Sequence, residues 1–265
     1  MVLIFDLDGT LLHSTFFSDV LMKMLCHKLE THNLPADKSI VFQEIIKKFL
    51  EKLAAEDKTP AYDWDLIARE YLTQYDLPGE WNCEIEDYYK SDEIIKHSFL
   101  YKDVESALEW LSENQYVMVL LTNGLHKYQD NVIEKLGLQK YFQKIVMPDP
   151  LLFNFVKPNP EIFEFAAQGF PEPYIVIGDS LYFDVYGAKS AGYHAIWLMR
   201  RLPKQYLELP IQARTQKINH NQTFLRKYLF ESAPFLKASS HELDLDLFKP
   251  DTIIANLLEL KELLV

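Results

Sequence analysis

The chain has 265 residues, enough for one large domain or for a core with a smaller second domain. Apolar residues make up 48% and charged residues 25%, which excludes a disordered chain, and a formal net charge of −12 argues against general binding to nucleic acid or anionic membrane. The two cysteines, Cys26 and Cys83, lie outside any Cys-x-x-Cys or Cys/His array, so neither a disulfide scaffold nor a structural zinc site is expected.

Short, continuous apolar runs predict the strands. In chain order these runs are residues 2–5, 117–121, 145–147, 174–177 and 195–198. Continuous rather than alternating runs are typical of strands buried on both faces of a parallel sheet. Helical patterns lie between them, at 104–111, 128–136 and 160–167. Gly137 follows the second of these helices as a C-terminal glycine. This alternation predicts an α/β fold with a doubly wound, Rossmann-like, mostly parallel sheet.

Residues 14–96 interrupt the alternation. Apolar residues recur at helical spacing over 16–25 and 45–53, and residues 64–72 have a helical pattern as well. We therefore expect a helical insert, forming a small domain of its own, between the first strand and the helix that returns the chain to the sheet. The chain would cross between the two parts at 13–14 and 97–101.

The C-terminal third contains a basic segment, residues 200–237, with eight Lys and Arg against two Glu and no sustained periodicity. This segment would serve dimerisation, steer anionic substrates, or form a solvated surface excursion. Residues 252–264 predict an amphipathic closing helix.

Polar residues directly follow three of the apolar runs. Asp6-Leu7-Asp8 ends the first, Thr122-Asn123-Gly124 ends the second, and Gly178-Asp179-Ser180 ends the run at 174–177. Because such sheets bind ligands beyond the carboxyl ends of their strands, these three groups should meet at one edge of the sheet.

The first group carries two carboxylates. On an extended backbone, positions i and i+2 point to the same face, so Asp6 and Asp8 would enter one space. Carboxylates placed in this way repel each other unless a cation or a shared proton lies between them. An isolated Asp-x-Asp is commonly a solvated turn, but its place directly after a buried strand favours a functional site.

The later groups suit phosphate and metal. A hydroxyl and free N–H groups at a strand end suit phosphate oxygens, although Thr122-Asn123-Gly124 alone is equally typical of a helix start. Lys157 precedes a helix start and would be either a surface lysine or an ammonium that neutralises a carboxylate and a phosphate. Asp179 and Asp184 offer oxygen ligands that suit Mg²⁺, while Asp184 alone would also suit a helix N-terminus.

Together and in this order, the groups are far more specific than each is alone. Four segments, taken in order, closely resemble the four motifs of the haloacid dehalogenase (HAD) superfamily. They are Phe5-Asp6-Leu7-Asp8-Gly9-Thr10, Leu121-Thr122-Asn123-Gly124, Lys157-Pro158 and Gly178-Asp179-Ser180-(x)3-Asp184. The insert resembles the cap of the subgroup that includes phosphoglycolate phosphatase, some 5'-nucleotidases and sugar-phosphate phosphatases. The resemblance implies an α/β core of residues 1–13 and 99–265, with 200–248 as an extra basic segment, and a helical cap of residues 14–98.

The resemblance also implies a Mg²⁺-dependent phosphatase that hydrolyses a small phosphate monoester through an aspartyl-phosphate. Asp6 would be the nucleophile, Asp8 the general acid and base, and Lys157 a catalytic positive charge. The phosphate would be bound by Thr122, Asn123 and Lys157. The metal would be held by Asp6, Asp8 through its backbone carbonyl, Asp179 and Asp184. Asp184 would either ligate the metal through water or orient Lys157.

Three alternatives remain open. A phosphomutase would share every core residue but shield a bisphosphate intermediate from water; Thr10, where sugar mutases often carry valine, favours hydrolysis. A 2-haloacid dehalogenase needs no metal, so the acids Asp8, Asp179 and Asp184 disfavour it. A non-enzymatic module that docks an acidic partner on the basic segment would leave the acidic set without a purpose.

The expected partner is a small phosphorylated metabolite: phosphoglycolate, a sugar phosphate or a nucleoside monophosphate. The sequence does not choose among them, because it does not place cap side chains such as His13, Phe17, Tyr62 and Trp64. No nucleic acid polymer or membrane partner is expected, and the protein would be a monomer or homodimer. Since residues 2–5 are too short for a signal-peptide core and no apolar run would span a bilayer, we expect a cytoplasmic protein.

Overall fold

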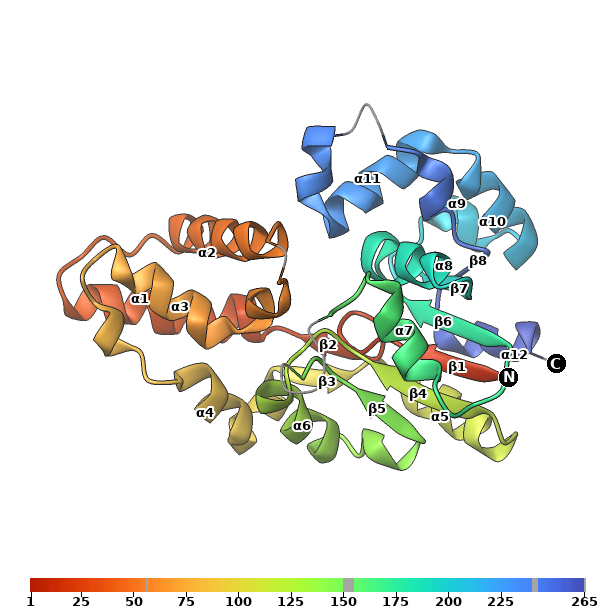
Figure 1. The fold of residues 1–265 in the computed structure, drawn as a ribbon, viewed down its shortest axis with the longest axis horizontal. Helices are drawn as coiled ribbons and strands as arrows, with labels where there is room; N and C mark the ends of the chain where they lie inside the picture. Colours follow the sequence, from red (N-terminus) through yellow and green to blue (C-terminus); the bar gives the residue numbers. More distant parts are fainter. Residues whose placement is uncertain (56, 150–154, 240–242, 265) are drawn as a thin grey trace.

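A six-stranded parallel sheet forms the centre of the molecule in the computed structural model, which describes residues 1–55, 57–149, 155–239 and 243–264 (Figure 1). In spatial order its strands are β5 (Lys144–Val146), β4 (Val117–Leu121), β1 (Val2–Phe5), β6 (Tyr174–Gly178), β7 (His194–Leu198) and β8 (Thr252–Ile254). The chain builds outward from β1 in both directions, as in doubly wound sheets. The predicted fold class and its five predicted strands are confirmed.

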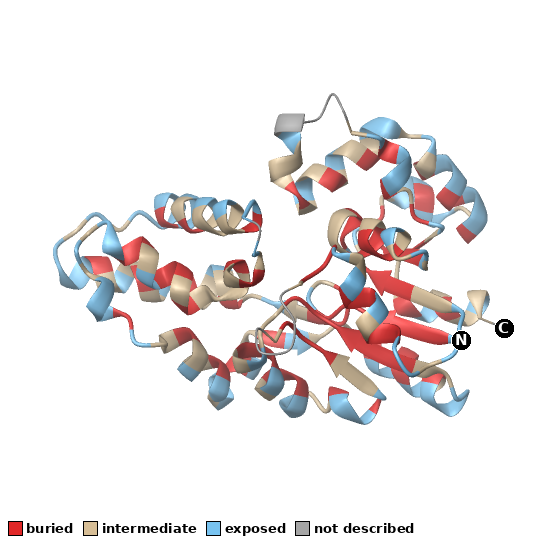
Figure 2. Ribbon diagram, in the orientation of Figure 1, coloured by how far each residue is buried: buried red, intermediate tan, exposed pale blue. Residues whose placement is uncertain are grey.

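Apolar side chains cover both faces of this sheet. Along β1, Leu3 and Phe5 belong to the core shared with α5 (Val104–Glu113) and α6 (His126–Lys135). Val2 and Ile4 belong to the opposite core, with α7 (Pro160–Ala167) and α8 (Gly187–Ser190). Figure 2 shows the central strands as a largely buried layer. Burial on both faces explains why the strands read as continuous apolar runs.

The helical insert, residues 15–97, leaves and rejoins the sheet domain between two short strands, β2 (Leu12–Ser14) and β3 (Ser98–Leu100). These strands pair antiparallel, so the outgoing and returning chains lie side by side. In its described part, the α-helices are α1 (Met22–Thr31), α2 (Lys38–Leu53), α3 (Trp64–Thr73) and α4 (Glu84–Lys90). They extend to one side of the sheet, on the left of Figure 1, where α4 packs on α6.

The basic segment, which shows no sustained periodicity in the sequence, is helical in the structure. It contains α9 (Lys204–Leu207), α10 (Ile211–Asn219) and α11 (Gln222–Ser232). Buried Ile218, Leu225 and Leu229 join the core on the β1 face that carries Val2 and Ile4. Short helices with few apolar positions show too little periodicity to be recognised from sequence, although tertiary packing stabilises them.

The closing segment was also predicted only in part. Residues 252–264 begin with β8, which pairs with β7, and end in the short helix α12 (Leu260–Leu263). An apolar run this short fits a strand and a helix equally well, and the free edge of β7 selects the strand. No helix within the described ranges is long and apolar enough to cross a bilayer.

A buried carboxylate holds the insert together and connects it to α6. Asp65, in the first turn of α3, is only 1% exposed. It accepts hydrogen bonds from the Trp81 indole (2.7 Å) and from the Ile85 N–H in α4 (3.0 Å). The Tyr128 hydroxyl on α6 lies 3.0 Å from its other oxygen. One side chain thus joins α3, α4 and the sheet domain.

Replacing this carboxylate should destabilise the whole protein. We expect Asp65→Ala to lower the free energy of unfolding by about 3 kcal/mol or more, because several buried donors lose a charged acceptor. Urea unfolding followed by circular dichroism would measure it. Glu51→Ala, at an exposed position of α2, is the control and should change it by less than about 0.5 kcal/mol. A loss below about 1 kcal/mol for Asp65→Ala would contradict the assigned role.

Candidate active site

Three neighbouring strands deliver polar side chains to one edge of the sheet. Asp6 follows β1, Thr122 follows β4 and Asp179 follows β6, and these strands are hydrogen-bonded neighbours with β1 in the middle. Phe5 is in register with Leu120 on one side and Ile177 on the other, so the chain emerges at a similar level from all three. The structure therefore brings the three polar groups together, as the sequence predicts.

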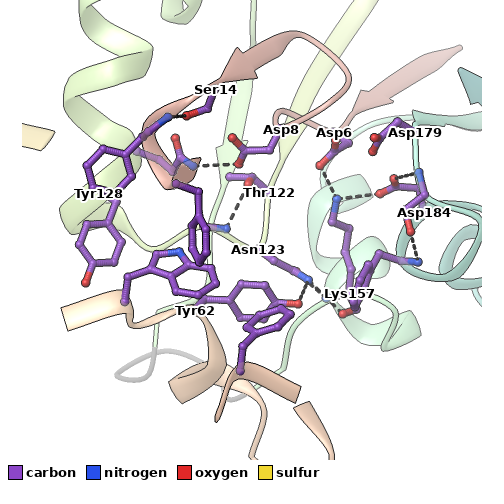
Figure 3. A pocket seen from close by; sticks show the side chains of 18 of the residues that line it. Asp6, Asp8, Ser14, Tyr62, Thr122, Asn123, Tyr128, Lys157, Asp179 and Asp184 are labelled. Carbon is purple, nitrogen blue, oxygen red and sulfur yellow. Dashed lines mark hydrogen bonds and ion pairs between the residues drawn. The ribbon is translucent and has the colours of Figure 1, made fainter. Parts of the chain in front are cut away.

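A buried lysine lies between two of the carboxylates (Figure 3). The Lys157 ammonium is 2.6 Å from Asp6 Oδ1 and 2.7 Å from Asp184 Oδ1, and all three side chains are less than a tenth exposed. The second Asp184 oxygen accepts a hydrogen bond from the Ser180 N–H at 3.0 Å. Asp184 thus contacts Lys157, as one of the two roles that the sequence left open for it would require.

The acidic cluster carries more negative charge than Lys157 neutralises. Burial raises the pKa of Asp6 to about 7, opposed by the Lys157 ammonium and assisted by the neighbouring Asp184. Removal from bulk water and then the Asp6 and Asp184 charges raise the pKa of Asp179 well above its usual range. Burial alone would lower the pKa of Lys157, but Asp184 and Asp6 raise it, so this lysine stays charged. Full ionisation of the cluster at neutral pH therefore needs a further cation.

The donor set fits a magnesium ion. Asp6, Asp179 and Asp184 each offer a carboxylate oxygen, and these oxygens lie within 4.8 Å of one another. Asp6 Oδ2 is buried and has no hydrogen-bond partner among the described residues. An all-oxygen set with few carboxylates is the kind that Mg²⁺ prefers. The Asp8 carboxylate is not part of this cluster, so only the backbone carbonyl of Asp8 remains as the ligand that the sequence predicts.

The Asp8 carboxyl group faces the cavity and contacts α6 instead. Gln129 donates a hydrogen bond from its amide nitrogen to Asp8 Oδ2 at 2.9 Å. Asp8 is exposed to the cavity, but the surrounding protein still removes it in part from bulk water and so raises its pKa to about 6, opposed by the Lys157 charge and by this hydrogen bond. A carboxyl group with such a pKa can release or accept a proton near neutral pH. Gln129 was not predicted, because a single glutamine on a helix carries no sequence signal.

Asn123 connects three parts of the site. Its side-chain oxygen accepts from the Lys157 N–H (2.7 Å), and its amide nitrogen donates to the Lys157 carbonyl (3.0 Å) and to the Tyr62 hydroxyl (2.7 Å). The side chain thus positions the loop that carries Lys157 and contacts the insert. Thr122 accepts a hydrogen bond from the Gly124 N–H at 3.1 Å. Both Thr122 and Asn123 line the cavity, in the positions that the sequence predicts for phosphate contacts.

Two glycines make room for the carboxylates. Gly9 has φ +85°, and a Cβ there would lie 2.2 Å from Asp179 Oδ2. A Cβ on Gly178 would lie 2.2 Å from the carboxyl carbon of Asp184. Position 9 requires glycine because of both its positive φ and the nearby carboxylate. Position 178 requires glycine because of the nearby carboxylate alone.

The acids form the floor of a cavity of about 310 Å³ between the sheet edge and the insert. The insert contributes aromatic side chains, including Phe17, Tyr62 and Trp64, which the sequence singled out but did not place. His13 is not among the described lining residues; it lies on β2, where Nδ1 is 3.3 Å from the Tyr101 hydroxyl. The volume suits a small metabolite.

Comparison with known proteins identifies the relatives of this arrangement. The model of the haloacid dehalogenase-like hydrolase family matches residues 1–192. The chain is 29% identical over 203 residues to a glyceraldehyde 3-phosphate phosphatase of Pyrococcus furiosus, covering 74% of this chain and 79% of that protein. It is 28% identical to a phosphoglycolate phosphatase of Nitrosococcus oceani, covering 75% and 83%. The crystal structure of a HAD phosphatase from Thermococcus onnurineus has the same fold, with a TM-score of 0.65 at 24% identity, covering 99% and 97%.

Filling the space at Gly178 should disturb the site and the fold together. We expect Gly178→Ala to lower the free energy of unfolding by about 1–3 kcal/mol, because the new methyl group overlaps Asp184. Thermal unfolding monitored by calorimetry would measure it. Gly79→Ala is the matched control, since a Cβ there has nothing within 4 Å. Equal stability of the two variants would contradict the tight contact.

Proposed function

The chain belongs to the haloacid dehalogenase-like hydrolase family and is a phosphatase. On this premise, we propose that it hydrolyses a small phosphate monoester through an aspartyl-phosphate at Asp6. One observation carries the proposal. The Asp6 carboxylate, fixed on one side by Lys157, faces a cavity that Asp8 enters from the next position but one. A nucleophile and an acid/base thus line the same cavity, where Asp6 would reach phosphorus and Asp8 the leaving oxygen.

Asp6 would attack phosphorus in line with the leaving oxygen. A bond forms between the carboxylate oxygen and phosphorus, and the bond between phosphorus and the leaving oxygen breaks. Lys157 holds Asp6 in place through Oδ1. Its charge also offsets the negative charge of the phosphate, while Thr122 and Asn123 line the wall where the phosphate oxygens would lie.

Asp8 would move the protons of both half-reactions. Its carboxyl group donates a proton to the departing alkoxide, and the resulting carboxylate takes a proton from the water that attacks the aspartyl-phosphate. The raised pKa of Asp8 supports this double role, because a carboxyl group of ordinary pKa would hold few protons at neutral pH. Gln129 would keep Asp8 on the cavity side.

Asp6, Asp179, Asp184 and the Asp8 carbonyl would hold a magnesium ion. When bound, this ion would supply the positive charge that lets an anionic carboxylate approach an anionic phosphate. The unpaired Asp6 oxygen and the crowded carboxylates support this cofactor.

The helical insert supports a division into a core and a cap. We propose that residues 14–98 form the cap and that residues 1–13 and 99–265 form the core, because the cavity lies between them and each contributes lining residues. A cap that covers the phosphate would exclude water while the aspartyl-phosphate forms. The ligand class that fits this site is a small phosphorylated metabolite.

Removing the nucleophile should abolish the activity. We expect Asp6→Asn to reduce magnesium-dependent phosphate release from small monoesters to background, because an amide oxygen does not form a stable acyl phosphate. Phosphate release measured with Mg²⁺ and with a chelator would test this. Asp130→Asn, an exposed acid on α6, should keep wild-type activity. Release that survives in purified Asp6→Asn would assign the activity to another group.

Loss of the acid/base Asp8 should have an effect that depends on the leaving group, unlike loss of the nucleophile Asp6. We expect Asp8→Asn to lower kcat/KM, which reports the first half-reaction, by about 10²- to 10⁴-fold for alkyl phosphates. It should lower kcat/KM less for aryl phosphates, whose leaving groups need no proton. Steady-state rates on the two ester classes would measure the difference. Equal losses on both classes would contradict proton transfer by Asp8 in the first step.

A further inference from the structure

The wall of the cavity opposite the acids is made of aromatic rings from the insert. Phe17, Phe49, Tyr62 and Trp64, named here the aromatic wall, line the cavity and are each half-buried, so part of every ring remains accessible. The Phe49 and Trp64 rings are stacked at 5.2 Å and 24°. The Phe17 and Trp64 rings meet edge to face at 4.6 Å. These contacts fix the rings in place before a ligand binds.

The same cavity offers no cation to the leaving group. Among the described residues that line it, the charged ones are Asp6, Asp8, Asp179, Asp184 and Lys157. Lys157 lies between two of these carboxylates and is 3% exposed, so it is already paired. The side chains that the insert contributes to the lining are uncharged. A carboxylate on the leaving group would therefore be desolvated without a partner, beside an acidic cluster.

From these two features, and resting on the proposed phosphatase activity, we infer the class of substrate. The substrate is a phosphate monoester whose leaving alcohol is uncharged and carries a flat ring, which lies against the aromatic wall while the phosphate contacts Asp6 and Lys157. Stacking on aromatic faces supplies affinity without a hydrogen-bond partner for each atom. Of the substrates considered from the sequence, a nucleoside monophosphate belongs to this class and phosphoglycolate does not.

Four esters separate the ring from the charge. Benzyl phosphate has an uncharged ring, 4-carboxybenzyl phosphate adds a carboxylate to the same ring, ethyl phosphate has neither, and 2-phosphoglycolate has the carboxylate alone. With Mg²⁺ bound, we expect the wild-type kcat/KM for benzyl phosphate to exceed that for each of the other three by about tenfold or more.

Substitutions at Phe49 test the wall itself. Phe49→Leu keeps an apolar side chain but removes the ring, and it should lower kcat/KM for benzyl phosphate about tenfold more than kcat/KM for ethyl phosphate. Phe49→Lys places an ammonium in the wall and should raise kcat/KM for 2-phosphoglycolate about tenfold. Ile40→Ala, at an exposed position of the same helix and outside the cavity, is the control and should leave all four values unchanged.

The outcomes distinguish this inference from the proposed function. The substrate class is wrong if the wild type prefers 2-phosphoglycolate to benzyl phosphate. It is also wrong if Phe49→Leu leaves the ratio of the kcat/KM values for benzyl phosphate and ethyl phosphate unchanged. The phosphatase proposal would still stand in that case, provided that Asp6→Asn abolishes the release. If folded, magnesium-bound wild type releases phosphate from none of the four esters, the proposed function itself is overturned, and the substrate class with it.

Discussion

The buried ammonium group of Lys157 stabilises the carboxylates that gather at one edge of the sheet. Lys157 contacts Asp6 and Asp184 at 2.6 and 2.7 Å in surroundings that exclude most water. Buried carboxylates without such a partner would take up protons or destabilise the fold. The single lysine does not balance the whole cluster, since the pKa of Asp6 stays near 7 and that of Asp179 lies well above normal. The remaining negative charge would attract a divalent cation, and that cation would in turn allow an anionic substrate to bind at the same place.

The rest of the fold keeps this arrangement in position. Parallel pairing of β1 with β4 and β6 brings together residues that are far apart in the sequence. Gly9 and Gly178 leave room for the Asp179 and Asp184 carboxyl groups. The start of the basic segment contributes as well: Arg200 donates to the Thr10 carbonyl at 2.6 Å and to Asp103 at 2.8 Å. Arg200 thus connects the loop after β1 to Asp103 and acts as a structural partner.

Much of the fold could be predicted because its strands are buried on both faces, and such strands form continuous apolar runs in the sequence. The polar groups at their ends could be predicted to meet for the same reason. The elements and side chains that the sequence did not predict are those that depend on tertiary contacts. β8 is a three-residue strand that exists because β7 offers a free edge. Helices α10 and α11 are stabilised by a few buried residues rather than by a periodic stripe. Gln129 and Phe49 are common residue types on helices, and their roles depend on a cavity that only the packed insert creates.

The central step of the proposed mechanism is the formation of a covalent bond between phosphorus and Asp6. The most direct test is an acid-quenched reaction of the Asp8→Asn variant with p-nitrophenyl phosphate and Mg²⁺, followed by mass spectrometry of the peptides. This leaving group departs without a proton, so the first step should proceed, while hydrolysis of the intermediate should be slow without the Asp8 base. We expect one phosphoryl group on the N-terminal peptide, located at Asp6. A turning-over enzyme that accumulates no phosphoryl group, or carries it on another residue, would contradict it.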